Sequence, residues 1–235
     1  MVTMNDSLRP VADAAVLVSG GLDSAILTGL WARDRMVQPV YIRCGLHWEN
    51  DESAHCRRFL AALGSERVLP LVELAQPVGD LYGNHWSLTG NGVPASDSAD
   101  EAVFLPGRNV LLLAKAILMC HLRGIGKLGL APLGTNPFPD ATPAFFKAMA
   151  STVNTAVGGA VEIVLPFLNM HKVDVMRLGA CMPLEHSFSC IRPVGGIHCG
   201  ACNKCAERIG AFADARMTDP TPYASTAPRT SICTP

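Results

Sequence analysis

Residues 14–27 read AAVLVSGGLDSAIL, and this stretch decides the fold. A short apolar run leads into Ser-Gly-Gly. The segment after the glycines places four apolar residues on one helical face: Ile26, Leu27, Leu30 and Trp31. The pattern predicts a buried strand, a glycine turn and a helix in direct succession.

Strands and helices alternate from there to about residue 180. The apolar patterns predict further strands over residues 39–42, 68–74, 127–133 and 161–167, and further helices over residues 56–63, 109–122 and 143–157. Such alternation is typical of a parallel sheet covered by helices, with ligands bound beyond the carboxyl ends of the strands. We therefore predict an α/β fold, with a parallel sheet of about five strands and helices on both faces.

The glycine turn is a candidate phosphate site. It lies where a strand meets a helix, and the free N–H groups and dipole of a helix N-terminus favour an anion. Gly20 and Gly21 let the main chain approach an oxyanion, Ser19 and Ser24 can donate hydrogen bonds, and Asp23 can hold a divalent cation. Helix capping alone would explain any one of these residues, but the whole pattern favours function. The Walker A pattern is absent, so hydrolysis of a γ-phosphate is not predicted.

Four of the nine cysteines gather near the C-terminal end: Cys190, Cys199, Cys202 and Cys205. A disulfide framework would instead spread its cysteines through a small domain. The spacing brings soft ligands within reach of one tetrahedral Zn²⁺, and four thiolates close the site, so we predict a structural zinc ion. An iron–sulfur cluster stays open with the same ligands, as does replacement of one cysteine by His186 or His198.

The other cysteines are interpreted as packed or free thiols: Cys44, Cys56, Cys120, Cys181 and Cys233. His47-Trp48-Glu49 matches half of the zinc-deaminase signature. The other half is absent, since the cysteine pairs lie far downstream and lack the preceding proline. His47 is therefore interpreted as a loop residue.

Composition narrows the partners and the location. Nineteen Lys and Arg residues against twenty Asp and Glu give a net charge of −1, so a large nucleic acid is not the expected ligand. We find no apolar tract long enough for a membrane span and no secretory signal pattern, and we predict a cytoplasmic protein.

The SGGLDS motif resembles the signature of the PP-loop ATP pyrophosphatases, which cleave ATP between its α and β phosphates. The resemblance implies an adenine nucleotide alpha hydrolase-like fold. It also implies a pyrophosphate cradle made by Val18, Ser19, Gly20, Gly21, Leu22, Asp23, Ser24 and Ala25. Within that cradle, Asp23 would position Mg²⁺.

Together with the cysteine cluster, the motif resembles more narrowly the 7-cyano-7-deazaguanine synthases of the queuosine pathway, over roughly residues 14–214. The segments Pro106-Gly107-Arg108-Asn109 and 169–172 continue the likeness. It implies an ATP-dependent ligase that uses ammonia to convert 7-carboxy-7-deazaguanine into a nitrile, and a homodimer. Ser19, Asp23, Ser24 and Lys172 would serve catalysis, and Arg108 and Asn109 would bind the nucleotide.

The acceptor is less well specified by the sequence. Residues 133–142 depart from the family pattern, although Pro139-Asp140 remains, and we expect Asp140 and Arg108 to contact the substrate. Two alternatives stay open. One is an adenylating enzyme for another acceptor, such as a different deazapurine, a tRNA base or a protein carboxylate, and the other is a non-catalytic nucleotide-binding module.

Three regions are predicted along the chain. Residues 1–180 form the nucleotide-binding α/β domain, and residues 181–217 form a small helical subdomain that binds zinc. Residues 218–235 are rich in Pro, Thr and Ser and form a tail.

Overall fold

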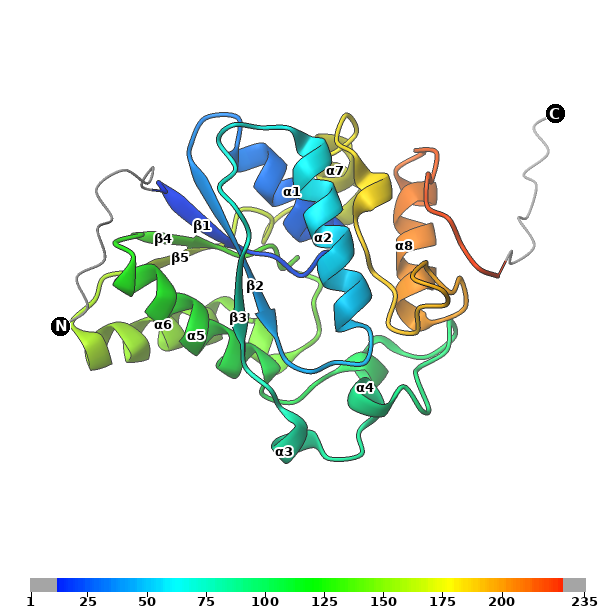
Figure 1. Cartoon of the computed structure of the whole chain (residues 1–235), viewed down its shortest axis with the longest axis horizontal. Coiled ribbons are helices and arrows are strands. Elements are labelled where there is room, and N and C mark those ends of the chain that lie inside the picture. The colour runs from blue at the N-terminus through cyan, green and yellow to red at the C-terminus, as the bar shows by residue number, and fades with distance from the viewer. Residues whose placement is uncertain (1–11, 226–235) are drawn as a thin grey trace.

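The computed structural model describes residues 12–225, which contain one parallel sheet of five strands (Figure 1). The strands are β1 (Ala14–Leu17), β2 (Val37–Arg43), β3 (Val72–Ala75), β4 (Lys127–Gly129) and β5 (Glu162–Val164). Their order in the sheet is β3-β2-β1-β4-β5, and every neighbouring pair is parallel. The predicted fold class is confirmed.

The strand order places β1 at the centre of the sheet. The chain builds outward through β2 and β3 on one side, then returns to add β4 and β5 on the other. Crossovers therefore diverge at the carboxyl ends of β1 and β4, and such a switch point is where open α/β sheets bind their ligands. The loop that contains Gly20 and Gly21 follows β1 directly and so lies at this point.

Eight helices and three short 3₁₀ turns occur in the described residues. The helices are α1 (Leu22–Trp31), α2 (Glu49–Leu63), α3 (Gly79–Tyr82), α4 (Trp86–Thr89), α5 (Arg108–Leu122), α6 (Pro143–Val157), α7 (Lys172–Leu178) and α8 (Asn203–Asp214). The turns are η1 (Asp100–Val103), η2 (Pro139–Ala141) and η3 (Leu184–His186).

Two apolar clusters fill the two sides of the sheet. Ala15 faces a cluster that includes Leu113 and Ile117 of α5, whereas its neighbour Val16 faces one that includes Ile26 of α1. Alternate residues of β1 thus point to opposite faces, as a strand requires. Figure 1 shows α5 and α6 on one face and α1, α2 and α7 on the other, as predicted.

Several boundaries differ from the predicted ranges. Helix α2 begins at Glu49, well before the predicted start at Cys56, because acidic residues favour a helix N-terminus but carry no apolar pattern. Strand β4 ends at Gly129, shortly before Pro132, which has no N–H to donate. Strand β3 starts at Val72, and Val68 makes only an isolated bridge to Val37.

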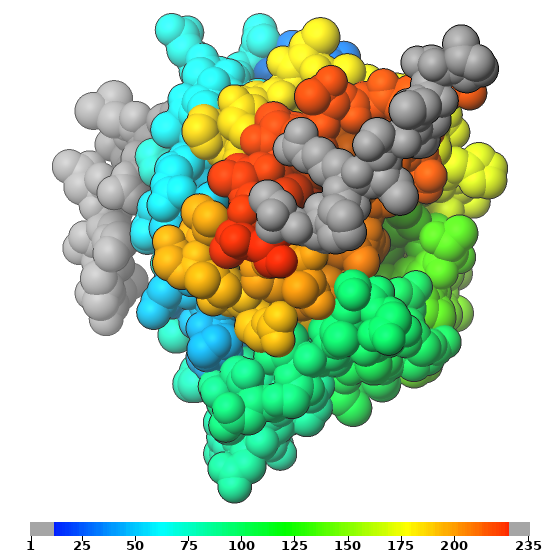
Figure 2. All heavy atoms as spheres, turned by 90° about the vertical axis from the view of Figure 1, so that its right-hand side faces the viewer, coloured from blue at the N-terminus to red at the C-terminus, as the bar shows by residue number. Residues whose placement is uncertain are grey.

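Part of the predicted tail is described, and it packs against the cysteine region. Tyr223 pairs with His198, and the Ala224 amide donates to the His198 carbonyl at 2.8 Å. In Figure 2 the residues just before the grey segment lie on the surface of this region. Cys233 lies outside the described residues, as does most of the segment searched for a secretory signal.

None of the helices in residues 12–225 combines the length and apolarity needed to cross a membrane. The division into three regions stays a prediction.

Candidate active site

The loop after β1 is held from two directions. Its Gly20 has φ +73°, which L side chains rarely adopt, and a Cβ there would lie 3.0 Å from Glu52 Cγ. On the other side, the Phe188 amide donates a hydrogen bond to the Gly20 carbonyl at 2.7 Å. Glycine is therefore required at this position, and the loop is pressed between α2 and the segment that leads to the cysteines.

The two serines brace the loop from within. Ser24 Oγ accepts a hydrogen bond from the Ser19 amide at 3.2 Å and lies 3.3 Å from Ser19 Oγ. Helix α1 starts after Gly21, which has no side chain to cap the first turn. The N-terminal N–H groups of α1 are thus left for an anion, which fits a phosphate cradle.

Lys172 and Asp23 meet although they lie 149 residues apart. Lys172 Nζ is 2.6 Å from Asp23 Oδ1, and both side chains are about a quarter exposed. The structure thus brings the start of α7 to the loop after β1. A cation and an anion at the same edge of the loop suit a site that must hold both phosphate oxygens and a divalent cation.

A cavity of about 380 Å³ opens beside this loop, within the range of small-molecule sites. Most of the predicted site residues line it: Val18, Ser19, Gly21, Leu22, Asp23, Ser24, Arg108, Asn109 and Lys172. Gly20 and Ala25 instead face a small neighbouring hollow behind the loop.

Asp140 is buried but is not on the wall of this cavity. Its carboxylate accepts a hydrogen bond from the Asn109 amide at 3.3 Å, and its carbonyl accepts one from Asn109 Nδ2 at 2.8 Å. Asp140 therefore anchors the start of α5, next to Arg108. Contact between Asp140 and a substrate stays a prediction.

Sequence reasoning missed a second set of cavity residues: Tyr41, Trp48, Glu52, Phe188, Ser189, Lys204 and Arg208. Among them, Glu52 is buried and accepts a hydrogen bond from Tyr41 Oη at 2.5 Å. Burial raises the pKa of Glu52 to about 7, although Arg108 and Tyr41 act in the opposite direction. An acidic residue in the first turns of a helix normally suggests a dipole effect, so no local signal pointed to the cavity.

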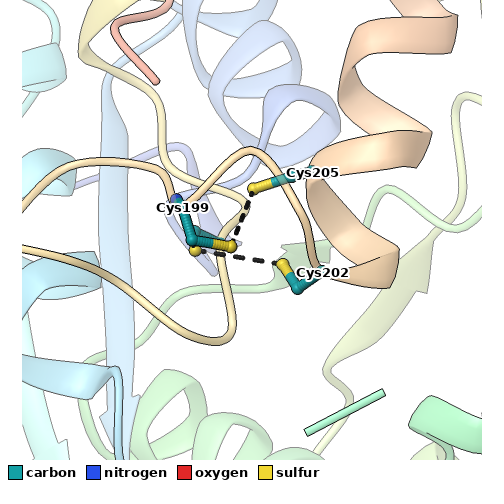
Figure 3. Close-up of side chains that lie close together, drawn as sticks. Cys199, Cys202 and Cys205 are labelled. Atoms are coloured by element: carbon teal, nitrogen blue, oxygen red, sulfur yellow. Dashed lines mark hydrogen bonds between the residues drawn. The ribbon is translucent and has the colours of Figure 1, made fainter. Parts of the chain in front are cut away.

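The four predicted metal ligands are brought together. Their sulfur atoms all lie within 4.8 Å of one another, and all four side chains are buried. Figure 3 shows three of them turned toward one point, with Cys205 at the start of α8. The amides of Arg192 and Cys199 each donate to Cys190 Sγ at 3.3 Å, as thiolate sulfur would favour. This donor set fits a tetrahedral metal ion such as Zn²⁺.

Neither flanking histidine belongs to this sulfur cluster. His198 Nε2 accepts a hydrogen bond from the Ser189 amide at 3.1 Å, and His186 lies near Glu185 at the surface. The cysteines outside the cluster are free in the described part of the chain: Cys44, Cys56 and Cys120 are buried, and Cys181 is exposed. In the half-signature of a deaminase, Glu49 is occupied by the amides of Cys44 and Gly45.

The fold and the site together define a PP-loop-like α/β protein with a cysteine centre that can hold a metal such as zinc. Residues 13–216 match the family model described as "Queuosine biosynthesis protein QueC". The chain belongs to this family, which confirms the resemblance drawn from the motifs.

Curated relatives cover almost the whole chain. A "7-cyano-7-deazaguanine synthase" of Anaeromyxobacter sp. is 32% identical, with 92% of this chain and 97% of the relative covered. The "7-cyano-7-deazaguanine synthase 1" of Mesorhizobium japonicum is also 32% identical, over 90% of this chain and 93% of the relative. A synthase of Acidobacterium capsulatum is 28% identical, over 90% and 96%. The similarity thus spans both the glycine loop after β1 and the cysteine cluster.

Proposed function

We propose that the protein is an ATP-dependent carbon–nitrogen ligase that converts 7-carboxy-7-deazaguanine and ammonia into 7-cyano-7-deazaguanine. The observation that carries this proposal is the cavity at the switch point of the sheet, where Lys172, Arg108 and residues 18–25, here called the phosphate loop, converge. The relatives named as synthases of this product support the choice of substrate.

The loop side of the cavity would bind the pyrophosphate part of ATP. Backbone N–H groups within residues 20–24 and the hydroxyls of Ser19 and Ser24 would donate to phosphate oxygens, and Lys172 would add a positive charge. Asp23 would hold Mg²⁺, which neutralises charge on the phosphates when bound. The cysteines would hold Zn²⁺, which fastens the loop before α8 and has no open position for chemistry.

Arg108 and Asn109 would act at the other side, where the acceptor meets the α-phosphate. Arg108 Nε is buried and has no hydrogen-bond partner among the described residues, so it can donate to a ligand oxygen in the cavity. Asp140, next to Asn109, would accept from the N–H edge of a guanine-like base.

The reaction begins when a carboxylate oxygen of the acceptor attacks the α-phosphorus of ATP, which gives an acyl adenylate and pyrophosphate. Ammonia then displaces AMP and leaves an amide. A second adenylation, on the amide oxygen, allows dehydration to the nitrile. These steps require positioning and charge stabilisation rather than a side-chain nucleophile.

The direct test incubates the purified protein with Mg·ATP, ammonium and 7-carboxy-7-deazaguanine, and follows the products by mass spectrometry. Nitrile together with AMP is the expected result. Asp23→Ala should abolish turnover without unfolding the protein. The matched control is Asp174→Ala, which changes a half-exposed aspartate of α7 that pairs with Arg177. Full activity in Asp23→Ala would contradict the assignment of the loop.

One observation favours a second candidate, an adenylating enzyme for another acceptor. The segment 133–142 departs from the family pattern, and Asp140 contacts Asn109 rather than the cavity. The same assay with other acceptors distinguishes the candidates, because AMP would then form only with a different carboxylate or amide. Binding of ATP with no AMP from any acceptor would indicate a non-catalytic module.

A further inference from the structure

Glu52 lies on the cavity wall, yet the proposed binding of ATP gives it no role. Its Oε2 accepts a hydrogen bond from Tyr41 Oη at 2.5 Å, and the side chain is buried. A buried carboxyl that lines a ligand cavity is costly to keep unless a partner or a reaction uses its charge. The positive charge of Arg108 on α5 attracts this carboxylate, but the guanidinium makes no hydrogen bond with Glu52.

Glu52 packs directly against the phosphate loop. A Cβ on Gly20 would meet Glu52 Cγ at 3.0 Å and the Glu52 carbonyl at 3.2 Å. At this position a negative charge repels phosphate oxygens, so Glu52 is unsuited to bind the pyrophosphate. It is suited to attract a small cation into the cavity. The proposed reaction uses two small cations. One is the metal ion that accompanies ATP and is not consumed, and the other is ammonium, which is consumed.

Resting on the ligase function proposed above, we propose that Glu52 binds ammonium in the cavity and takes the proton that must leave before nitrogen can attack. One N–H bond of ammonium breaks, its proton goes to the carboxylate, and its electron pair stays on nitrogen. That pair forms the C–N bond as the bond between the acyl carbon and the phosphate oxygen breaks. AMP leaves with the bonding pair, and the second proton shed by nitrogen goes to its phosphate.

The titration behaviour of the site agrees with this role. Burial raises the pKa of Glu52 to about 7, near the pH at which a general base works best. Groups from three directions face the carboxyl: Tyr41 and Cys44 on and after β2, Glu49 and Cys56 on α2, and Arg108 on α5. Tyr41 and Arg108 favour the charged form, whereas Glu49 opposes it.

The test separates the two halves of the reaction in Glu52→Gln. The first half is measured without ammonium, as the exchange of pyrophosphate into ATP that requires 7-carboxy-7-deazaguanine. Its rate in the variant should stay close to the wild-type rate. Amide formation from ammonium at neutral pH should fall about 100-fold, as expected when a general base is removed. Hydroxylamine is largely uncharged at neutral pH, so hydroxamate should form at similar rates in both proteins. Raising the pH, which supplies free ammonia, should partly restore the variant.

Tyr41→Phe supplies an independent readout. Loss of the Tyr41 hydrogen bond raises the pKa of Glu52 further. In a plot of the rate of amide formation against pH, the rise on the acid side should therefore move to higher pH. Glu73→Gln is the control, because Glu73 is a partly buried carboxylate that pairs with Arg43 on the β3 side and does not line the cavity. Glu73→Gln should leave the pH dependence of amide formation unchanged.

Three outcomes would overturn the proposal: unchanged amide formation from ammonium in Glu52→Gln, an equal loss of pyrophosphate exchange, or an equal loss with hydroxylamine. An equal loss of exchange would indicate a metal-binding or purely structural role instead. No exchange in the wild-type protein would contradict the ligase function itself, so the two failures are distinguishable.

Discussion

Gly20→Ala should destabilise the protein much more than the same change at the adjacent glycine. Gly20 has φ +73°, and an added Cβ would lie 3.2 Å from the Glu52 carbonyl oxygen, a backbone atom that cannot swing away. Gly21 has φ −69°, and the nearest atom to an added Cβ is Ser19 Oγ at 3.4 Å. The two positions therefore form a matched pair within one loop.

The magnitude follows from two costs at Gly20. Left-handed backbone costs an L residue about 1–2 kcal/mol, and overpacking against a rigid neighbour adds about 1–3 kcal/mol. The reduced entropy of the unfolded chain returns roughly 0.4–1 kcal/mol. The net loss in the free energy of unfolding is about 3 kcal/mol, or roughly 6–12 °C in Tm for a chain of this size. At Gly21 the corresponding change is within about 1 kcal/mol, because alanine is only a poorer N-cap there.

Thermal unfolding of both variants by circular dichroism measures this difference. Urea unfolding gives the free energies, provided that both variants keep the wild-type m-value. Equal shifts in the two variants, or a larger shift at Gly21, would refute the described loop geometry. Wild-type stability in Gly20→Ala would mean that the contact with α2 is absent in solution.

Three further predictions concern the metal, the ion pair and pH. Cys202→Ser, or removal of metal with a chelator, should lower the Tm, and a metal-free protein with unchanged melting would contradict a structural centre. Lys172→Met should raise the KM for ATP in pyrophosphate exchange, yet change the free energy of unfolding by only about 1 kcal/mol, because its pair with Asp23 is partly exposed. Burial raises the pKa of Glu52 from 4.5 to about 7 in the folded state, so this group's contribution to stability is lost as pH rises through 7. Glu52→Gln removes that loss. The free energy of unfolding of the variant, measured with urea and compared with that of the wild type, should therefore grow by up to about 3 kcal/mol from pH 5 to pH 8. A constant difference would show that Glu52 does not titrate in this range.

The centre of the fold and both motifs could be predicted from the sequence. A buried strand followed by glycines and a helix is a local pattern, so β1, α1 and the loop between them were predictable from residues 14–27. The cysteine cluster was predictable for the same reason, since its spacing is local. Helix α2 was only partly predicted, because Glu49 and Glu52 are buried polar residues that an apolar pattern passes over.

The rest of the site depends on contacts between distant segments. Nothing near Lys172 indicates that it meets Asp23, and the family resemblance alone suggested its role. Ser189 reaches the cavity because Phe188, its neighbour, is hydrogen-bonded to the Gly20 carbonyl. Such a contact joins residues far apart in the chain, and no periodicity or spacing records it.

Arg208 connects the cysteine cluster with the proposed nucleotide site. It is almost fully buried, lines the cavity, and donates to neutral oxygens: Thr221 Oγ1 at 2.7 Å, Ser187 Oγ at 2.9 Å and the Leu184 carbonyl at 2.9 Å. Because its hydrogen-bond acceptors among residues 12–225 are all neutral, this buried guanidinium keeps its positive charge available to an anion in the cavity. Its acceptors lie outside the α-helices and strands, and the segment that contains Leu184 and Ser187 runs on into Cys190. A metal held by Cys190 and by Cys205, one turn before Arg208 on α8, would therefore hold the guanidinium and its acceptors in register. It would couple the cysteine centre to a positive charge that lines the cavity.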